Sequence, residues 1–234
     1  RQLQYKLAFK FSIKVIFQNN DDKNELLNLK LLNTDKTCII NGSGVNLDKF
    51  ICVPLPSTPA ILYVGRLVKD KGIGEYLNLA QRIKISGKNI RCLLVGPFDS
   101  NPSALKSEEL QPYIDNGIVE YFGEQSDVRP YLAQCTVYVL PSYHEGTPKS
   151  VLEAMATGRP IVTTDAPGCR ETVSDNVNGF LVPIKDTDAL FNAVIKIIDN
   201  KNIARKFSVE SRRIAEEKYD VNKVNTAIKK IMRL

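Results

Sequence analysis

The most constraining feature of this sequence is a regular alternation of short apolar runs with longer stretches of helical pattern. It starts near residue 61. The apolar runs that we interpret as strands are 61–64, 91–95, 118–122, 137–140, 161–163 and 180–182. The helical patterns lie at 72–85, 107–115, 128–134, 148–157 and 188–198. Strands that alternate with helices form βαβ units, so the sequence predicts a doubly wound α/β fold with a parallel sheet covered on both faces.

The chain divides into three predicted parts. Residues 1–54 hold two more strand candidates, 13–17 and 37–40, on either side of a helical pattern at 21–32. The proline-rich stretch 54–59 is typical of a linker, so we expect the main domain to span 55–218. Residues 219–234 carry apolar residues at helical spacing, which predicts an amphipathic helix that docks back on the N-terminal part. Because the chain starts at Arg1 without an initiator methionine, we expect a truncated or excised piece of a longer protein.

The composition is that of an ordinary water-soluble protein. Of the 234 residues, 43% are hydrophobic and 25% are charged, as in typical globular domains. No apolar run approaches the ~18 residues that a membrane-spanning helix needs. The five cysteines are widely spaced and form no Cys-x-x-Cys pair, so we expect no metal site, and reduced cysteines favour a cytoplasmic protein.

The formal net charge of +6 is compatible with anionic small substrates, an acidic membrane surface or nucleic acid. The basic residues are scattered along the chain, and no aromatic residues alternate with them as a base-stacking platform requires. We therefore expect no nucleic-acid partner. A solvated basic surface accounts for most individual lysines.

Ligands of a doubly wound sheet bind beyond the carboxyl ends of its strands. The loops at these positions carry glycines, cations and carboxylates together. They are residues 65–72, 96–97, 123–124, 141–150 and 165–171. Any one such loop is an ordinary surface connection, but the whole set favours a ligand-binding rim.

The loop after the first strand supplies Arg66 and Lys71 with a glycine on either side. A diphosphate needs permanent positive charge and a backbone that can approach closely, and this loop offers both. Two solvated surface charges are the alternative. The chain lacks a complete dinucleotide glycine motif and a Gly-Lys-Ser/Thr phosphate loop, so NAD enzymes and P-loop kinases are disfavoured.

The loop after the fourth strand leads into a predicted helix. Thr147 is a suitable N-cap, Pro148 suits the first helical position, and Gly158 ends the pattern. The free amides of the first turn form a ready anion site. They belong to Lys149, Ser150 and Val151.

Two carboxylates flank this helix start. Glu145 lies just before the helix and Glu153 about a turn and a half inside it, so both can face one cleft and bind ligand hydroxyls. A solvated helix glutamate is the alternative for Glu153. His144, beside Glu145, could be mistaken for a general base, but we interpret it as structural.

The segment from Ser142 to Val162 resembles the signature of family-4 retaining glycosyltransferases, in which seven residues separate two glutamates. Segments 41–46, 64–72 and 175–182 match other motifs of this family in the same order. The resemblance extends from about Val15 to Val182 and is nearest to bacterial enzymes of capsule, lipopolysaccharide or glycan-carrier synthesis. It implies the C-terminal, Rossmann-like half of a GT-B fold, with residues 1–54 as a remnant of the acceptor-binding half.

The resemblance also implies roles for single residues. The implied catalytic residues are Arg66 and Lys71, which would bind the donor diphosphate, and Glu145, which would contact donor-sugar hydroxyls. Glu153 would hold the ribose. The other implied donor-binding residues are Gly65, Gly96, Phe122, Gly123, Gly146, Thr147, Pro148, Lys149, Ser150, Val151 and Gly168. Where the family often has Gly-Gly after the fifth strand, this chain has proline before Gly168, which removes one amide donor.

The implied activity is hexosyl transfer from a nucleotide sugar, for which the family favours a UDP-sugar, with retention at the anomeric carbon and without metal or cofactor. The implied partners are the nucleotide sugar and a glycan or lipid-linked acceptor, bound through the missing N-terminal domain. Contact with the inner face of the membrane and homodimerisation through exposed apolar faces are further expectations. A nucleotide-sugar-binding module without transfer activity, or an epimerase or phosphorylase of the same architecture, is the alternative.

Overall fold

A computed structural model describes residues 2–232; Arg1, Arg233 and Leu234 lie outside the described residues. Its centre is a six-stranded parallel sheet with the strand order β5-β4-β3-β6-β7-β8. The strands are β3 (Ala60–Val64), β4 (Arg91–Val95), β5 (Glu120–Tyr121), β6 (Val137–Leu140), β7 (Ile161–Thr164) and β8 (Gly179–Val182). The order reverses between β3 and β6, so the predicted doubly wound fold is confirmed.

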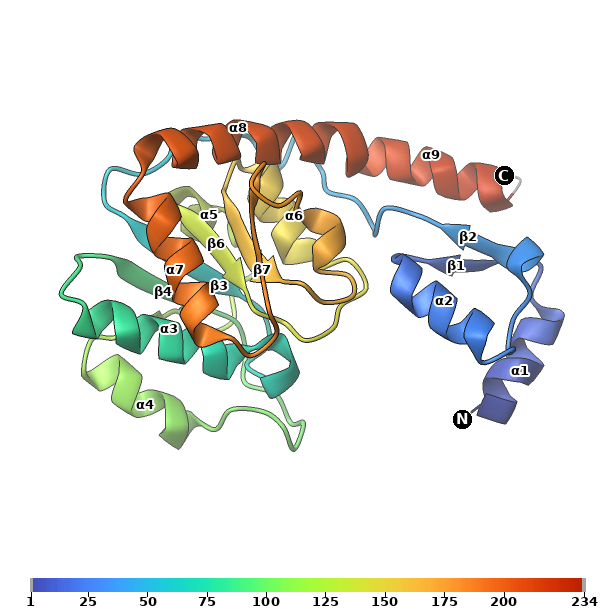
Figure 1. Cartoon of the computed structure of the whole chain (residues 1–234), viewed down its shortest axis with the longest axis horizontal. Helices are drawn as coiled ribbons and strands as arrows, with labels where there is room; N and C mark the ends of the chain where they lie inside the picture. Colours follow the sequence, from blue (N-terminus) through green and yellow to red (C-terminus); the bar gives the residue numbers. More distant parts are fainter. Residues whose placement is uncertain (1, 233–234) are drawn as a thin grey trace.

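Helices cover both faces of this sheet (Figure 1). One face carries α3 (Ile73–Ile85), α4 (Ser107–Asp115) and α7 (Thr187–Ile198), and the other carries α5 (Arg129–Gln134) and α6 (Lys149–Ala156). A further helix, α8 (Lys201–Lys218), packs against α6 and was absent from the prediction. The predicted strand at 118–122 is shorter than expected because the amides of Ile118 and Val119 bind the carbonyl of Tyr113 in the turn after α4.

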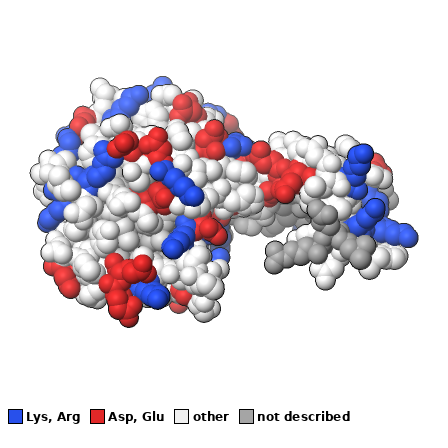
Figure 2. All heavy atoms as spheres, turned by 60° about the horizontal axis from the view of Figure 1, so that its bottom comes forward, with Lys and Arg blue, Asp and Glu red and all other residues white. Residues whose placement is uncertain are grey.

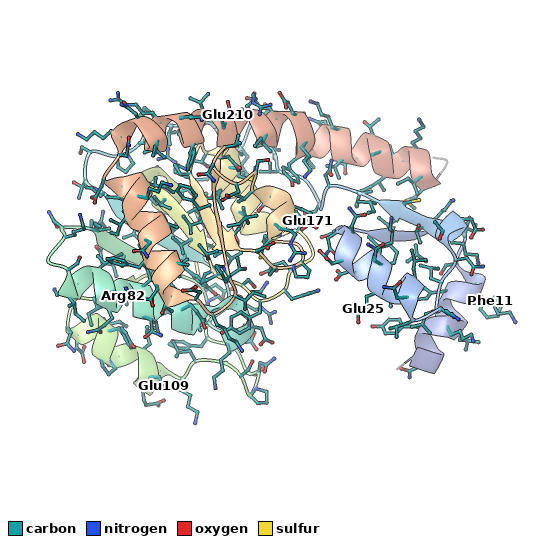
Figure 3. The ribbon with its side chains drawn as sticks, viewed as in Figure 1. Phe11, Glu25, Arg82, Glu109, Glu171 and Glu210 are labelled. Atoms are coloured by element: carbon teal, nitrogen blue, oxygen red, sulfur yellow. The ribbon has the colours of Figure 1, made fainter. Side chains whose placement is uncertain are left out.

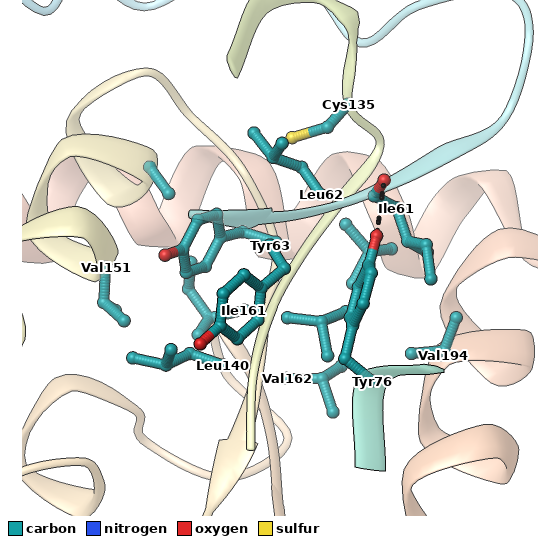
Figure 4. Close-up of a cluster of buried hydrophobic side chains, with 14 of the residues drawn as sticks. Ile61, Leu62, Tyr63, Tyr76, Cys135, Leu140, Val151, Ile161, Val162 and Val194 are labelled. Carbon is teal, nitrogen blue, oxygen red and sulfur yellow. Dashed lines mark hydrogen bonds between the residues drawn. The ribbon is translucent and has the colours of Figure 1, made fainter. Parts of the chain in front are cut away.

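The strands form because they are apolar on both faces. Each residue of β6 is buried, and so are the first four residues of β3. Figure 4 shows side chains from both strands packed with Tyr76 of α3, whose hydroxyl donates to the carbonyls of Leu93 (2.7 Å) and Ile61 (3.4 Å). A sheet covered on both faces requires such continuous apolar runs, so the core fixes where the strand ends and their loops lie.

The N-terminal segment forms a small separate lobe beside the main body (Figure 1). Its elements are α1 (Gln2–Phe11), β1 (Val15–Phe17), α2 (Asn20–Asn28), a 3-10 turn η1 (Thr34–Lys36) and β2 (Thr37–Ile39). Strands β1 and β2 pair in parallel, and α2 lies between them in the sequence. The helix predicted at 21–32 ends earlier because Lys30 takes a left-handed conformation, with φ 53°. The sequence patterns did not predict α1.

The C-terminal helix α9 (Val221–Met232) lies over the segment that follows β2 (Figure 1). The amide of Val45 donates to the carbonyl of Tyr219 (2.8 Å), and the amide of Val221 donates to the carbonyl of Val45 (3.0 Å). The expected tail helix therefore reaches the N-terminal part. The domain boundaries at 54/55 and 218/219 stay predictions.

The connection between the lobe and the sheet is fastened by two arginines. Arg159 is fully buried and donates to the carbonyls of Cys135 (2.9 Å), Pro54 (3.1 Å) and Val53. Arg212 donates to the carbonyl of Phe50 at 2.8 Å. The proline-rich stretch predicted to be a linker is thus anchored at its first residue, Pro54.

Charges of both signs are dispersed over the surface. Figure 2 shows lysines and arginines interleaved with acidic side chains on one face of the larger body, so this face has no continuous basic stripe. Within residues 2–232, no helix is both long and apolar enough to cross a membrane. All five cysteines are free thiols.

Candidate active site

The loop after β3 is fastened to the loop after β6. It contains a 3-10 turn, η2 (Lys69–Lys71), in which the carbonyl of Asp70 accepts hydrogen bonds from the Tyr143 amide (2.9 Å) and the Ser142 hydroxyl (3.0 Å). Gly72 ends the turn at φ +72°, and a Cβ there would lie 2.1 Å from the carbonyl oxygen of Pro141. Only glycine fits this approach, which brings Lys71 beside Glu145.

Lys71 and Glu145 form a close ion pair. The Lys71 Nζ lies 2.5 Å from both carboxylate oxygens, and the Ser142 hydroxyl oxygen lies 2.9 Å from Oε1, so its proton is shared between Oε1 and the Asp70 carbonyl. The Glu145 side chain is only 8% exposed. Burial of a carboxylate is costly without a paired cation and hydrogen bonds, and this site supplies both.

A cavity of about 340 Å³ opens beside this pair at the switch point between β3 and β6. It brings together most of the predicted site residues. The residues that line it are Val64, Gly65, Arg66, Lys71, Leu140, Glu145, Thr147, Pro148, Lys149, Ser150 and Glu153. Glu145 and Glu153 both line this cavity, and the roles predicted for them stay predictions.

Glu153 lies deep on α6, with its side chain 12% exposed. Burial raises the pKa of this carboxyl, while the positive charges of Lys149 and Lys49 oppose the rise. The Lys149 Nζ lies 3.9 Å from its Oε1. Lys49 comes from the chain between the lobe and β3 and belongs to no motif, so the sequence patterns did not identify it.

Arg66 stands at the mouth of the cavity. Its side chain is 58% exposed and forms an ion pair with Asp99, with 2.8 Å between Nη1 and Oδ2. The backbone amide of Asn101 and the Arg66 guanidinium together lower the pKa of Asp99. Arg66 is thus a solvated cation on a long side chain at the rim, where it can reach an anion.

Some predicted residues lie outside the cavity. Gly96 and Gly123 bind each other, with 2.8 Å between the Gly96 amide nitrogen and the Gly123 carbonyl oxygen. Phe122 packs on Tyr131 with 4.7 Å between ring centroids. These residues form the neighbouring strand ends, and their predicted role in a base pocket stays a prediction. The other predicted residues that do not line the cavity are Gly146, Val151 and Gly168.

The start of α6 differs from the prediction. The helix begins at Lys149, with Pro148 rather than Thr147 in the N-cap position. Thr147 lies just before the helix, and its amide donates to the Gln18 side chain at 2.9 Å. The amide of Val151 already donates to the Pro148 carbonyl (3.0 Å). Within residues 2–232, the amides left without a partner in this turn are those of Lys149 and Ser150.

The N-terminal lobe reaches the same loop. Asn19 is fully buried and its Nδ2 donates to the carbonyls of Glu145 (3.2 Å) and Gly146 (3.4 Å). His144 lies 2.8 Å from Asp22, between Nε2 and Oδ1, which agrees with its structural interpretation. Gln18 and Asn19 belong to a distant segment without a motif, so the sequence could not assign them to the site.

The loop after β7 supports Glu145 from the other side. The Glu145 amide donates to the carbonyl of Pro167 at 2.9 Å. Gly168 has φ +78°, and a Cβ there would lie 2.1 Å from the Glu145 carbonyl oxygen. Pro167 therefore contributes an acceptor to the loop, although it has no amide to donate.

Replacing Gly168 by alanine tests how tightly this loop is packed. We expect Gly168→Ala to lower the free energy of unfolding by about 3 kcal/mol, because the left-handed strain and the backbone contact add. Gly87 has φ +70° with no atom within 4 Å of the position that a Cβ would take, so Gly87→Ala should cost only about 1 kcal/mol. Urea unfolding of both variants measures the difference. Equal losses of unfolding free energy in the two variants would show that the loop around Gly168 can shift to accommodate a Cβ.

The part of the chain that contains this site matches a known protein family. The profile of a family described as "Glycosyl transferases group 1" matches residues 58–200, which is more than half of the chain. The chain belongs to this glycosyltransferase family. The matched residues include the whole cavity lining, so the family membership concerns the part of the chain that builds the site.

Similar curated proteins are bacterial glycosyltransferases. The chain is 32% identical over 93% of its length to the N,N'-diacetylbacillosaminyl-diphospho-undecaprenol alpha-1,3-N-acetylgalactosaminyltransferase of Campylobacter jejuni, covering 59% of that protein. It is 26% identical over 93% of its length to the capsular polysaccharide biosynthesis glycosyltransferase CapM of Staphylococcus aureus, covering 60% of it. The chain thus spans about three fifths of these relatives.

Solved structures with the same fold are GT-B glycosyltransferases. Sucrose-phosphate synthase from Thermosynechococcus elongatus aligns over 99% of this chain and 60% of its own, with a TM-score of 0.83 and 26% identity. Anabaena HepE in complex with UDP aligns over 99% of this chain and 68% of its own, with a TM-score of 0.86 and 20% identity. The expected GT-B architecture is therefore confirmed.

Proposed function

We propose that this chain binds a nucleotide sugar, most simply a UDP-sugar, as the donor site of a retaining glycosyltransferase of bacterial polysaccharide or lipopolysaccharide synthesis. The observation that carries the proposal is the Lys71–Glu145 pair at one wall of a cavity that also holds Arg66 and Glu153. Support comes from the names of the bacterial relatives and from the UDP bound in HepE.

The cavity contains the groups that departure of a diphosphate requires. In the transfer, the bond from the anomeric carbon to the β-phosphate oxygen breaks and a bond to the acceptor hydroxyl oxygen forms. The hydroxyl proton leaves with the released nucleotide. Negative charge grows on the diphosphate, where Arg66, Lys71 and the free amides at the start of α6 stabilise it.

In this proposal the two glutamates bind hydroxyls of different parts of the donor. Glu145, neutralised by Lys71, accepts hydrogen bonds from the donor sugar. Glu153, one turn and more along α6, accepts them from the ribose. The spacing of these two residues matches the signature of retaining enzymes, which is why retention is part of the proposal. Protein cations supply the charge stabilisation, so we propose that the reaction needs no metal or cofactor.

The acceptor and the cellular place are further parts of this proposal. The name of the Campylobacter jejuni relative includes a diphospho-undecaprenol acceptor, which supports a glycan or lipid-linked acceptor here. We place the reaction in the cytoplasm, at the inner face of the membrane. Family membership disfavours an epimerase or phosphorylase, and a binding module without transfer stays the alternative.

Calorimetry separates the enzyme from the binding module. The chain is titrated with UDP, UDP-glucose and UDP-N-acetylglucosamine, and UDP release from each sugar nucleotide is followed in parallel. We expect binding of UDP and of at least one sugar nucleotide. Slow donor hydrolysis supports transfer chemistry, whereas binding without any turnover supports the module. The absence of all binding would refute the proposal.

Two variants test the residue assignment. Arg66→Ala and Glu153→Gln should each weaken UDP binding by more than about 1 kcal/mol, the scale of a charged hydrogen bond. Because burial raises the pKa of Glu153, its carboxylate protonates at a higher pH than usual, and the advantage of the wild type over Glu153→Gln should shrink as the pH falls. Arg205→Ala, at an exposed position, is the control. Unchanged UDP affinity in both variants, with the fold intact, would refute the assignment of Arg66 and Glu153 to the nucleotide.

A further inference from the structure

The two residues between β1 and α2 form hydrogen bonds to the backbone of residues 145–147. These residues, Gln18 and Asn19, form the corner between β1 and α2, and Asn19 is the N-cap of α2. The Gln18 Oε1 accepts the amide of Thr147 at 2.9 Å. The Asn19 Nδ2 donates to the carbonyls of Glu145 and Gly146. Three consecutive residues of the loop are thus fixed by two side chains from the opposite lobe.

No other hydrogen bond within residues 2–232 satisfies these two carbonyls. The bond to the Glu145 carbonyl is buried, and buried backbone groups rarely go unpaired, because an unmet partner costs about 1–3 kcal/mol. The contact is also close-packed: a Cβ on Gly146 would lie 2.6 Å from the Gln18 Oε1. The corner therefore limits the positions that the Glu145–Thr147 backbone can take.

Asn19 has two separable tasks. Its Oδ1 accepts the Asp22 amide at 2.7 Å, which caps α2. Its Nδ2 makes the contacts to the loop and also donates to the Asp22 carboxylate at 2.9 Å. A serine in this position can cap the helix but is too short to reach the loop carbonyls. The two tasks can thus be tested apart.

A histidine–carboxylate contact and an ion pair lie at the same junction. Asp22 lies beside His144, and Asp21 lies 2.9 Å from Arg170, between Oδ2 and Nη1. Figure 3 shows Glu171, the neighbour of Arg170, on the side of the larger body that faces α2. The lobe therefore meets the larger body at the loops that flank Glu145.

We propose that Gln18 and Asn19 are positioning residues, which hold the Glu145–Thr147 backbone so that Glu145 meets the sugar of the bound donor. This inference rests on the proposed function. Two of the groups assigned to the nucleotide, Arg66 and Glu153, lie on other elements and make no hydrogen bond to the corner. The corner should therefore affect binding of the sugar part more than binding of the nucleotide part.

The test compares UDP with UDP-sugars in the full chain. Dissociation constants for UDP, UDP-glucose and UDP-N-acetylglucosamine are measured for the wild type, Gln18→Met and Asn19→Ser. We expect UDP affinity to stay within about twofold and the affinity ratio of sugar nucleotide to UDP to fall at least about fivefold, the scale of one lost hydrogen bond. Gln18→Glu keeps an acceptor for the Thr147 amide and should recover the ratio.

Controls separate positioning from folding. Asn33→Ser makes the same change at another N-cap of the lobe, where the side chain makes no capping bond, and should leave both affinities unchanged. Thermal unfolding shows whether Asn19→Ser keeps the fold. An unchanged ratio, or an equal loss for UDP and UDP-sugar, overturns the inference. Failure of the wild type to bind UDP would instead refute the proposed function.

Discussion

Replacement of Arg159 by methionine is expected to lower the free energy of unfolding by about 3–5 kcal/mol. The side chain is fully buried, and methionine would leave the carbonyls of Cys135 and Pro54 without a donor. A guanidinium presents several donors in a fixed fork, so one side chain satisfies carbonyls from separate segments. The midpoint of thermal unfolding should fall by roughly 10 °C for a domain of this size.

Two further variants show whether the loss of stability comes from the hydrogen bonds of the Arg159 guanidinium. Arg159→Lys keeps the charge but offers one nitrogen, so it should lose a large part of the same stability. Arg205→Met makes the same substitution at an exposed position and should change stability by less than about 0.5 kcal/mol. Similar stability of Arg159→Met and Arg205→Met would show that the anchored connection contributes nothing to folding.

The main sheet was predictable because its signal is local. Residues 91–95 and 137–140 were predicted with the bounds that the structure gives, since a strand buried on both faces must be apolar throughout. Helix α8 was missed although it is 18 residues long. Its exposed face carries many charges, which weakened the apolar pattern by which helices were recognised.

The site was predictable only where its residues share a loop or a motif. Lys71 and Glu145 were assigned from their motifs, and the structure brings them together through the contact of Gly72 with Pro141. Gln18, Asn19 and Lys49 approach the site through tertiary folding alone. Sequence spacing carries no information on such approaches, so a single sequence could not reveal them.

The same limit explains the error at the start of α6. Local rules correctly favour threonine as an N-cap and proline in the first turn. In the structure Pro148 takes the N-cap position, and the Thr147 amide donates to the Gln18 side chain, a contact from another lobe that local rules do not include. The amide of Val151, expected to bind phosphate, is taken up by the Pro148 carbonyl.

A double-mutant cycle on Lys71 and Glu145 should give the largest functional effect. Lys71→Met leaves the nearly buried Glu145 carboxylate without its cation, which should cost about 3 kcal/mol of stability at neutral pH. Glu145→Gln leaves a lysine that solvent can reach and should cost less. In the double variant stability should return close to that of the wild type, since no unpaired charge remains buried.

Function should not return with stability. Lys71→Met and the double variant should both lose donor binding, and donor turnover should fall by about 10²–10³-fold, because the cation that stabilises the leaving diphosphate is absent. The exposed Lys88–Asp199 pair, with 2.9 Å between its charged atoms, should show a coupling below about 1 kcal/mol in the same cycle. Recovery of turnover in the double variant would make Lys71 only a partner of Glu145. Turnover that is lower in the stable double variant than in Glu145→Gln would place the Lys71 ammonium in the reaction itself.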